Sequence, residues 1–221
     1  MISVPVPDIA PGAEWRVLLP LSLAVPLLFL FPPLGVALLA LGAFSAYFYR
    51  DPDREPAGEG ILTPADGHVS VIREDGDRVR VGVFMSPFDV HVVRAPADGE
   101  VTRLDHRGAA HKPAFAKESE RNERLEYTLV ADAGDSADGD EPAAEQAGVR
   151  TDGALIAGWF ARRISPYVSR GDRLDRGQRL GYIAFGSRAD VVLPPEYDAG
   201  DVRVAVGEAV RAGESVIARR E

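Results

Sequence analysis

The adjacent residues Gly186 and Ser187 are the strongest candidates for covalent chemistry in this 221-residue chain. Apolar residues lie on both sides of them, at 182–185 and 191–193, and predict two short strands with a tight bend between them. Glycine adopts backbone dihedrals that other residues avoid, which lets the Ser187 Oγ approach the Gly186 carbonyl carbon. The pair therefore predicts attack of the serine on its own peptide bond, although a plain turn would use the same two residues.

Ser187 also suits a second chemistry, that of a serine hydrolase. His91 is a candidate base because the ordinary pKa of histidine lies near neutrality, and Asp66 would orient it as the acid of a catalytic triad does. The G-x-S-x-G elbow of α/β hydrolases is absent, since residues 185–189 read Phe-Gly-Ser-Arg-Ala. A membrane-anchored serine hydrolase with the triad Ser187, His91 and Asp66 stays open as an alternative.

The composition argues against several other kinds of chemistry and partner. The chain has no cysteine, which excludes thiolate chemistry, and its two lysines, Lys112 and Lys117, lie in one polar stretch with nothing apolar to lower their pKa. The formal net charge of −9 argues against a nucleic-acid partner, because phosphate binding needs a basic face. The spacing of His106 and His111 fits no common metal motif, so no metal site is expected.

An uncharged run from 17 to 49, rich in Leu, Ala, Val and Phe, predicts a membrane-associated helical segment. An N-terminal tail (1–16) precedes it, and a Pro/Gly-rich linker (50–60) follows it. Arg50 and Arg54 lie just beyond the run, and positive charge at this place is typical of the cytoplasmic side. We therefore expect the protein at the cell membrane, with the rest of the chain in the cytoplasm.

Residues 61–221 are expected to form one domain that is mostly β. Alternating polar and apolar residues predict strands at 68–72, 78–84, 90–93, 125–130 and 201–206. The motif Pro-Ala-Asp-Gly occurs at 64–67 and 96–99, and a turn of the form G-[DEQ]-x-[LV] occurs twice in 170–180 and twice in 206–216. These turns resemble those of biotinyl and lipoyl carrier domains, which implies a barrel-sandwich-hybrid-like fold. A non-catalytic carrier-like binding module is therefore a second alternative.

Two polar stretches lie outside the predicted strands. Residues 132–148 are acidic and poor in apolar side chains, which is typical of a solvated loop. Residues 106–124 are long for a connection between strands, and they contain His111. Because long polar loops often close over substrates, we expect His111 to contact a substrate.

Several segments together resemble the short-form phosphatidylserine decarboxylase proenzymes, which include the archaeal archaetidylserine decarboxylases. These segments are YFYRDPDREP, TPADG, FMSPFDVHVVRAP, NER and ARRISPYVSRGDRLDRGQRLGYIAFGSRADVVLP. The order of ADG, DxHxxR and FGSRxD is specific, and the resemblance covers the chain from about Tyr47 to its end.

This resemblance implies a self-processing, pyruvoyl-dependent decarboxylase that converts a serine phospholipid, phosphatidylserine or archaetidylserine, to the ethanolamine phospholipid and CO₂. Attack of Ser187 on Gly186 would give an ester, and elimination with loss of ammonia would then leave a pyruvoyl group in place of Ser187. The products would be a β chain (1–186) and an α chain (187–221) that remain together as a heterodimer. The membrane would bring this site to the lipid headgroups.

One position departs from the family pattern. Many members have a second histidine three residues after the first, where this chain has Arg94. The resemblance then implies that His91 protonates the carbanion left after CO₂ departs, while Asp66 supports His91 when Ser187 is activated. Arg94 cannot act as a base near neutral pH, but its guanidinium suits a carboxylate or phosphate of the substrate.

Overall fold

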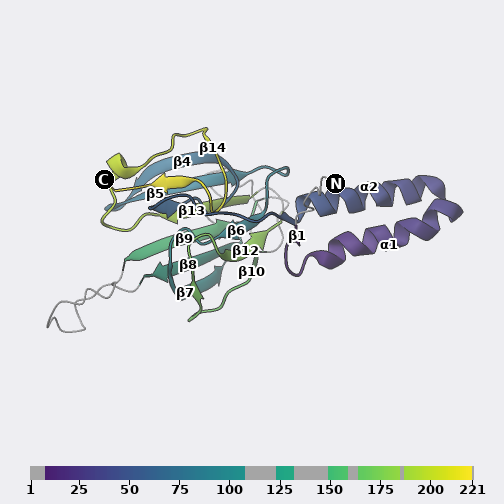
Figure 1. Cartoon of the computed structure of the whole chain (residues 1–221), viewed down its shortest axis with the longest axis horizontal. Coiled ribbons are helices and arrows are strands. Elements are labelled where there is room, and N and C mark those ends of the chain that lie inside the picture. The colour runs from purple at the N-terminus through teal and green to yellow at the C-terminus, as the bar shows by residue number, and fades with distance from the viewer. Residues whose placement is uncertain (1–7, 108–122, 132–148, 159–163, 185–186, 221) are drawn as a thin grey trace, which may run out of the picture.

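The computed structural model describes residues 8–107, 123–131, 149–158, 164–184 and 187–220. Within these ranges two helices extend away from a β domain (Figure 1). The helices are α1 (Glu14–Leu30) and α2 (Pro32–Phe48), with a 3₁₀ turn η2 at Ala199–Asp201. The strands are β1 (Asp8–Ile9), β2 (Arg50–Asp51), β3 (Ile61–Leu62), β4 (Gly67–Asp75), β5 (Arg78–Met85), β6 (Val92–Arg94), β7 (Gly99–Arg107), β8 (Arg124–Val130), β9 (Arg150–Ile156), β10 (Ile164–Pro166), β11 (Arg173–Leu174), β12 (Arg179–Ile183), β13 (Ser187–Val192), β14 (Ala209–Val210) and β15 (Val216–Ala218).

The largest sheet curls into a half-barrel of eight antiparallel strands in the order β11-β7-β8-β9-β13-β5-β4-β14. One face carries the apolar residue of each alternating pair, because successive side chains of a strand point to opposite faces. Val81, Leu125, Leu155 and Val191 are among the buried residues of this core. β13 lies in the middle of the sheet, between β5 and β9, and places Ser187 at its first position.

The sequence repeats occupy matching places at the two ends of this sheet. β14 pairs with the start of β4 as β11 pairs with the start of β7. In the first repeat, Asp66 Oδ1 accepts a hydrogen bond from the Ala212 N–H at 2.8 Å. In the second, Asp98 Oδ1 accepts one from the Arg176 N–H, also at 2.8 Å. Each Pro-Ala-Asp-Gly turn is therefore hydrogen-bonded, through its Asp, to the residue that precedes one of the G-[DEQ]-x-[LV] turns.

The fold class predicted from these repeats is wrong. The chain is mostly β, but its main element is the eight-stranded half-barrel rather than a barrel-sandwich hybrid. Two of the four repeated glycine turns supply the edge strands of this sheet, β11 and β14, with two residues each, and the other two lead into β12 and β15, which belong to smaller sheets. The alternating stretch 201–206 also fails to form a strand and contributes one isolated bridge, from Val202 to Ala218.

The predicted membrane-associated helical segment, residues 17–49, is also corrected, because it does not form a helix that could span a membrane. The uncharged run breaks at Phe31, because Pro32 and Pro33 take the first positions of a new helix, where a missing N–H costs nothing. The result is a hairpin of two 17-residue helices. None of the helices in the described ranges is both long and apolar enough to cross a membrane.

Candidate active site

Ser187 is buried within the main sheet. Its side chain is 0% exposed, and its Oγ lies 3.7 Å from the Sδ of Met85, its register partner in β5. Ala184, three residues earlier, is also buried. Gly186, the other half of the predicted cleavage bond, lies outside the described residues. Because the hydroxyl is shielded from bulk water, its deprotonation depends on a nearby protein side chain.

His91 is buried beside β6, and in the described ranges its ring has one hydrogen-bond acceptor. Its Nδ1 lies 2.9 Å from the backbone oxygen of Asp89, and its ring is 1% exposed. A carbonyl oxygen can only accept, so the neutral imidazole carries its hydrogen on Nδ1 and a lone pair on Nε2. Nε2 is buried and has no hydrogen-bond partner among the described residues. The ring therefore presents an unused basic nitrogen.

The surroundings of His91 favour its neutral form. Burial lowers the pKa of His91 to about 4; the backbone oxygen and the charge of Asp89 oppose this shift, and the Arg50 charge adds to it. Removing a charged imidazolium from water is costly, which is why burial has the largest effect. At neutral pH, His91 is accordingly a base ready to accept a proton.

The backbone joins His91 to both sides of the cleavage bond. Residues 86–91 follow directly after Met85, the neighbour of Ser187. The Ile183 N–H donates to the His91 backbone oxygen at 3.1 Å, and Ile183 ends β12 four residues before Ser187. In the described part of the chain no hydrogen bond links the side chains of His91 and Ser187 directly. The described backbone thus connects His91 and Ser187 through β5 and β12, but the two side chains do not form the hydrogen-bonded pair of a hydrolase there.

Asp66 occupies a different environment from the one expected of a triad acid. Its carboxylate forms an ion pair with Arg54 at 2.8 Å and accepts the Ala212 N–H. Burial raises the pKa of Asp66, and the Arg54 charge offsets this only in part. His91 has the Asp89 backbone oxygen as its partner instead of Asp66. The relay of hydrogen bonds that defines a serine hydrolase triad is therefore missing among these described residues.

Arg94 is held by a buried carboxylate that the sequence analysis did not single out. Its guanidinium donates to Asp51 at 2.8 Å, to the Pro52 oxygen at 2.9 Å and to the Gly177 oxygen at 3.0 Å. Asp51 is 1% exposed and also forms an ion pair with Arg179. Arg94 is also among the residues that line a cavity of about 450 Å³.

Two features of the site were missed from the sequence, and one predicted residue is outside the structure. Asp51 was assigned to a linker and Phe48 to the end of a membrane segment, yet both contact the site residues. The aromatic and charged pattern of residues 47–51, Tyr-Phe-Tyr-Arg-Asp, was the available signal that the apolar run had ended. His111 lies outside the described residues, and its contact with substrate stays a prediction.

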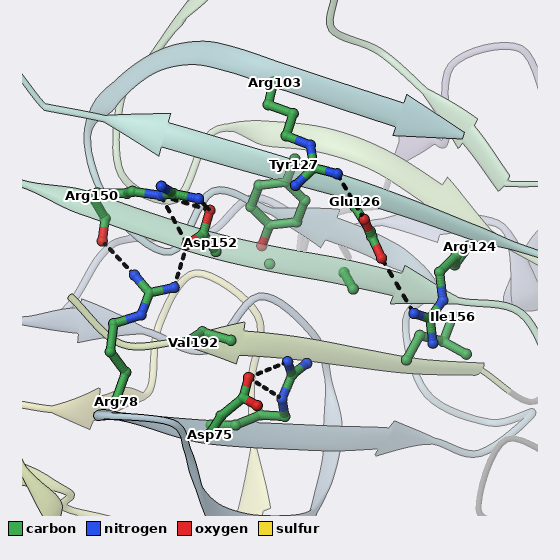
Figure 2. A pocket seen from close by; sticks show the side chains of 13 residues that line it. Asp75, Arg78, Arg103, Arg124, Glu126, Tyr127, Arg150, Asp152, Ile156 and Val192 are labelled. Atoms are coloured by element: carbon green, nitrogen blue, oxygen red, sulfur yellow. Dashed lines mark hydrogen bonds and ion pairs between the residues drawn. The ribbon is translucent and has the colours of Figure 1, made fainter. Parts of the chain in front are cut away.

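A second polar cavity, of about 240 Å³, lies on the main sheet (Figure 2). Its lining combines five arginines with three carboxylates: Arg78, Arg80, Arg103, Arg124, Arg150, Asp75, Glu126 and Asp152. Every one of these arginines forms an ion pair with one of these carboxylates. Asp152 accepts from both Arg78 and Arg150, and Glu126 from both Arg103 and Arg124 (Figure 2). We interpret this network as one that joins neighbouring strands.

Ser187, at the start of the central strand β13, and His91, at the end of the loop 86–91, are both buried. Residues 41–218 match the family described as phosphatidylserine decarboxylase, and the chain belongs to this family. A Halobacterium salinarum protein, provisionally named as an archaetidylserine decarboxylase proenzyme, is 52% identical over 193 residues, which cover 85% of this chain and 86% of that protein. The phosphatidylserine decarboxylase proenzyme of Thermobifida fusca is 43% identical over 187 residues, covering 84% and 78%. The resemblance found in the sequence is thereby confirmed.

Proposed function

We propose that this chain is the proenzyme of a pyruvoyl-dependent decarboxylase that converts phosphatidylserine or archaetidylserine to the ethanolamine phospholipid and CO₂. The observation that carries the proposal is the position of Ser187, buried at the start of a central strand in a member of the phosphatidylserine decarboxylase family. The proenzyme names of its relatives support a self-processing step.

In the processing step, the Ser187 Oγ attacks the Gly186 carbonyl carbon and its proton passes to a base. His91 Nε2 is assigned this role, because its lone pair is unused and its surroundings keep it neutral. The Gly186–Ser187 amide becomes an ester, and elimination releases the Gly186 carboxylate. Water then replaces the nitrogen, which leaves as ammonia. Asp66 supports this step from a distance, by fixing the turn that precedes β4.

The surroundings of Ser187 fit a pyruvoyl group at this position. The α chain that begins there would contain β13, β14 and β15, which pair with β5 and β9, with β4, and with β3 of the β chain. This pairing supports a heterodimer that survives cleavage and keeps the new end of the α chain in a buried place. The pyruvoyl ketone would supply a carbonyl that binds the substrate amine and withdraws electrons as CO₂ leaves.

The other residues of the chain orient the substrate and handle protons. His91 is assigned to hold and return the proton at the substrate carbon from which CO₂ departs. Arg94 and His111 are assigned to the acidic groups of the lipid. Arg94 would share its guanidinium between Asp51 and the substrate, which its five N–H donors allow.

Contact with a membrane surface, with the β domain in the cytoplasm, is part of this proposal. Its support is the set of large apolar side chains that α1 and α2 leave exposed: Trp15, Leu18, Leu19, Leu23, Val25, Phe29, Leu30, Leu34, Val36, Leu39, Leu41, Phe44 and Tyr47. Exposed apolar area of this extent is unusual in a protein surrounded by water alone. Flotation with vesicles of an anionic lipid tests this contact, and a protein that stays at the bottom of the gradient contradicts it.

The decarboxylase reaction is tested with purified protein and two substrates, a diacyl phosphatidylserine and an isoprenoid-ether archaetidylserine, each in detergent micelles. We expect CO₂ release from at least one of them, and labelling of the small fragment by a hydrazine reagent specific for ketones. Ser187→Ala is the matched control and should show neither. A wild-type protein without CO₂ release from either lipid would overturn the proposal, and reaction of an intact chain with a fluorophosphonate would favour the hydrolase alternative.

A further inference from the structure

Residues 47–51 form a junction segment between the helical hairpin and the β domain. Their sequence is Tyr-Phe-Tyr-Arg-Asp, and they include the end of α2 and the whole of β2. Each of the five side chains contacts a residue of the β domain or of α1. The contacts concentrate on the loop and strands that carry His91 and lead to Ser187.

The first group of contacts fixes the loop 86–91, which ends at His91. The Phe88 backbone oxygen accepts two hydrogen bonds, from the Tyr47 hydroxyl at 3.0 Å and from the Arg50 guanidinium at 2.8 Å. The Arg50 guanidinium also lies over the Tyr47 ring, 3.9 Å from its centroid. The two donors therefore support each other while they hold one point of the loop.

The second contact reaches the imidazole itself. The Phe48 ring is stacked on the His91 ring, with centroids 4.1 Å apart and planes inclined by 28°. Phe48 is 0% exposed and belongs to an apolar cluster with Val90, Val92 and Ala184. Since Nδ1 makes the only hydrogen bond of the ring among the described residues, the stack is the second restraint on the direction of Nε2.

The third group of contacts fixes the strands beside the site. Asp51 forms ion pairs with Arg94 of β6 and Arg179 of β12, which are register partners. Tyr49 packs edge-on against Tyr182 of β12, with ring centroids 6.0 Å apart. The junction segment is thus attached to both strands that adjoin His91, as well as to its ring.

We infer that Phe48 is a positioning residue for self-cleavage: its ring holds the His91 imidazole in the orientation in which Nε2 takes the proton of Ser187. This inference rests on the proposed function, in which His91 is the base. It goes beyond that function by making processing depend on a residue of α2. A base that rotates away from its proton donor loses most of its effect, because proton transfer needs hydrogen-bond geometry.

The test compares full-length variants for the fraction of chain cleaved over time, measured by intact mass. Phe48→Met keeps the volume but removes the ring, and we expect self-cleavage to slow by about 10- to 100-fold. Phe48→Tyr keeps the ring and should restore a rate within about threefold of wild type. Phe31→Met, at the exposed connection between α1 and α2, is the matched control and should cleave like wild type.

A second readout separates positioning from a loss of stability. In the uncleaved Ser187→Ala background, NMR of the imidazole reports the titration of His91. A flexible Met side chain covers the imidazole less completely than the stacked ring does and so weakens the effect of burial. Phe48→Met should therefore move the midpoint up from about 4 toward the ordinary 6.5, with Asp89 and Arg50 still the charged neighbours. A variant that is merely less stable would keep the wild-type midpoint while folded.

The outcomes distinguish this inference from the proposed function. If the wild type is not cleaved, the proposed function fails. If the wild type is cleaved, and Phe48→Met cleaves at the same rate with an unchanged His91 midpoint, the role of Phe48 is wrong and the function stands. Should Phe48→Met fail to fold, Phe48→Trp replaces it: a larger ring displaces the imidazole, so slowed cleavage in that folded variant supports the inference and unchanged cleavage contradicts it.

Discussion

The Nδ1 atom of His91 donates its hydrogen to the backbone oxygen of Asp89 over 2.9 Å. A backbone acceptor cannot change its protonation, so it fixes one tautomer of the neutral ring. The Nε2 lone pair is consequently available to a proton donor without any prior rearrangement. This relationship makes His91 a base whose readiness is set by burial rather than by a carboxylate partner.

The first prediction concerns the titration of His91 in the uncleaved Ser187→Ala protein. Burial holds the pKa of His91 at about 4, so the ring should stay neutral, with its hydrogen on Nδ1, throughout the neutral range. Nitrogen chemical shifts of the imidazole measure both the midpoint and the tautomer. A midpoint near 6.5, or a hydrogen on Nε2, would show that the base is not prepared in this way.

The second prediction concerns Asp51, the carboxylate shared by Arg94 and Arg179. Asp51→Asn leaves two guanidinium groups without their buried counter-charge, and we expect the free energy of unfolding to fall by about 3–5 kcal/mol. Urea unfolding of the uncleaved Ser187→Ala chain measures this difference. The exposed Asp53, changed to Asn, is the control and should alter stability by less than about 0.5 kcal/mol. Equal effects at the two positions would contradict the structural role of Asp51.

The third prediction concerns the charged cavity of Figure 2. Burial raises the pKa of Asp152, but hydrogen bonds from Thr128, Arg150 and Arg78 outweigh it, and the net shift is downward. A carboxylate with a lowered folded-state pKa stabilises the protein fully above its unfolded-state pKa, and this stability is lost as the pH falls through the folded-state value. Asp152→Asn should therefore cost roughly 1–3 kcal/mol near neutral pH and progressively less below about pH 4. If Asp152→Asn lowered the free energy of unfolding by the same amount near neutral pH and well below pH ~4, this charge effect would be excluded.

The fourth prediction concerns packing between β8 and β9. A Cβ on Gly153 would clash with the ring of Tyr127, which is buried. Gly153→Ala should destabilise the chain by about 1–3 kcal/mol, as overpacking of a filled core does. Thermal unfolding measures the loss. In a Tyr127→Leu background, Gly153→Ala should lower the stability clearly less. An equal loss of stability in the two backgrounds would mean that the Tyr127 ring is not the obstacle.

The sequence was most informative where chemistry and local geometry depend on a few neighbouring residues. The apolar stretches on the two sides of 186–187 form β12 and β13 of the structure, and Ser187 is the first residue of β13. The repeated Pro-Ala-Asp-Gly turns form equivalent contacts through Asp66 and Asp98. In each of these cases the residue types restrict the backbone within a few positions.

The sequence was least informative where distant segments meet. The repeats predicted a carrier-like fold because turn signals do not reveal that the strands between them pair into one wide sheet. Phe48 was missed because it ends an apolar run, and Asp51 because it precedes a proline in a stretch that was predicted to be a linker. Neither pattern reveals that these side chains pack against the loop and strands around His91. Likewise, only the fold shows that the carboxylate of Asp66 is taken by Arg54 and the backbone of Ala212.

The intact mass of the purified wild-type protein shows whether the chain cuts itself between Gly186 and Ser187. We expect two species, residues 1–186 and residues 187–221. The smaller one should be lighter than its unmodified sequence, because a ketone replaces the amine of Ser187 and its side-chain hydroxyl is lost. Ser187→Ala, purified in parallel, should give one species with the mass of the whole chain. A wild-type protein that stays a single chain, or a Ser187→Ala protein that is cut at the same bond, would contradict the account.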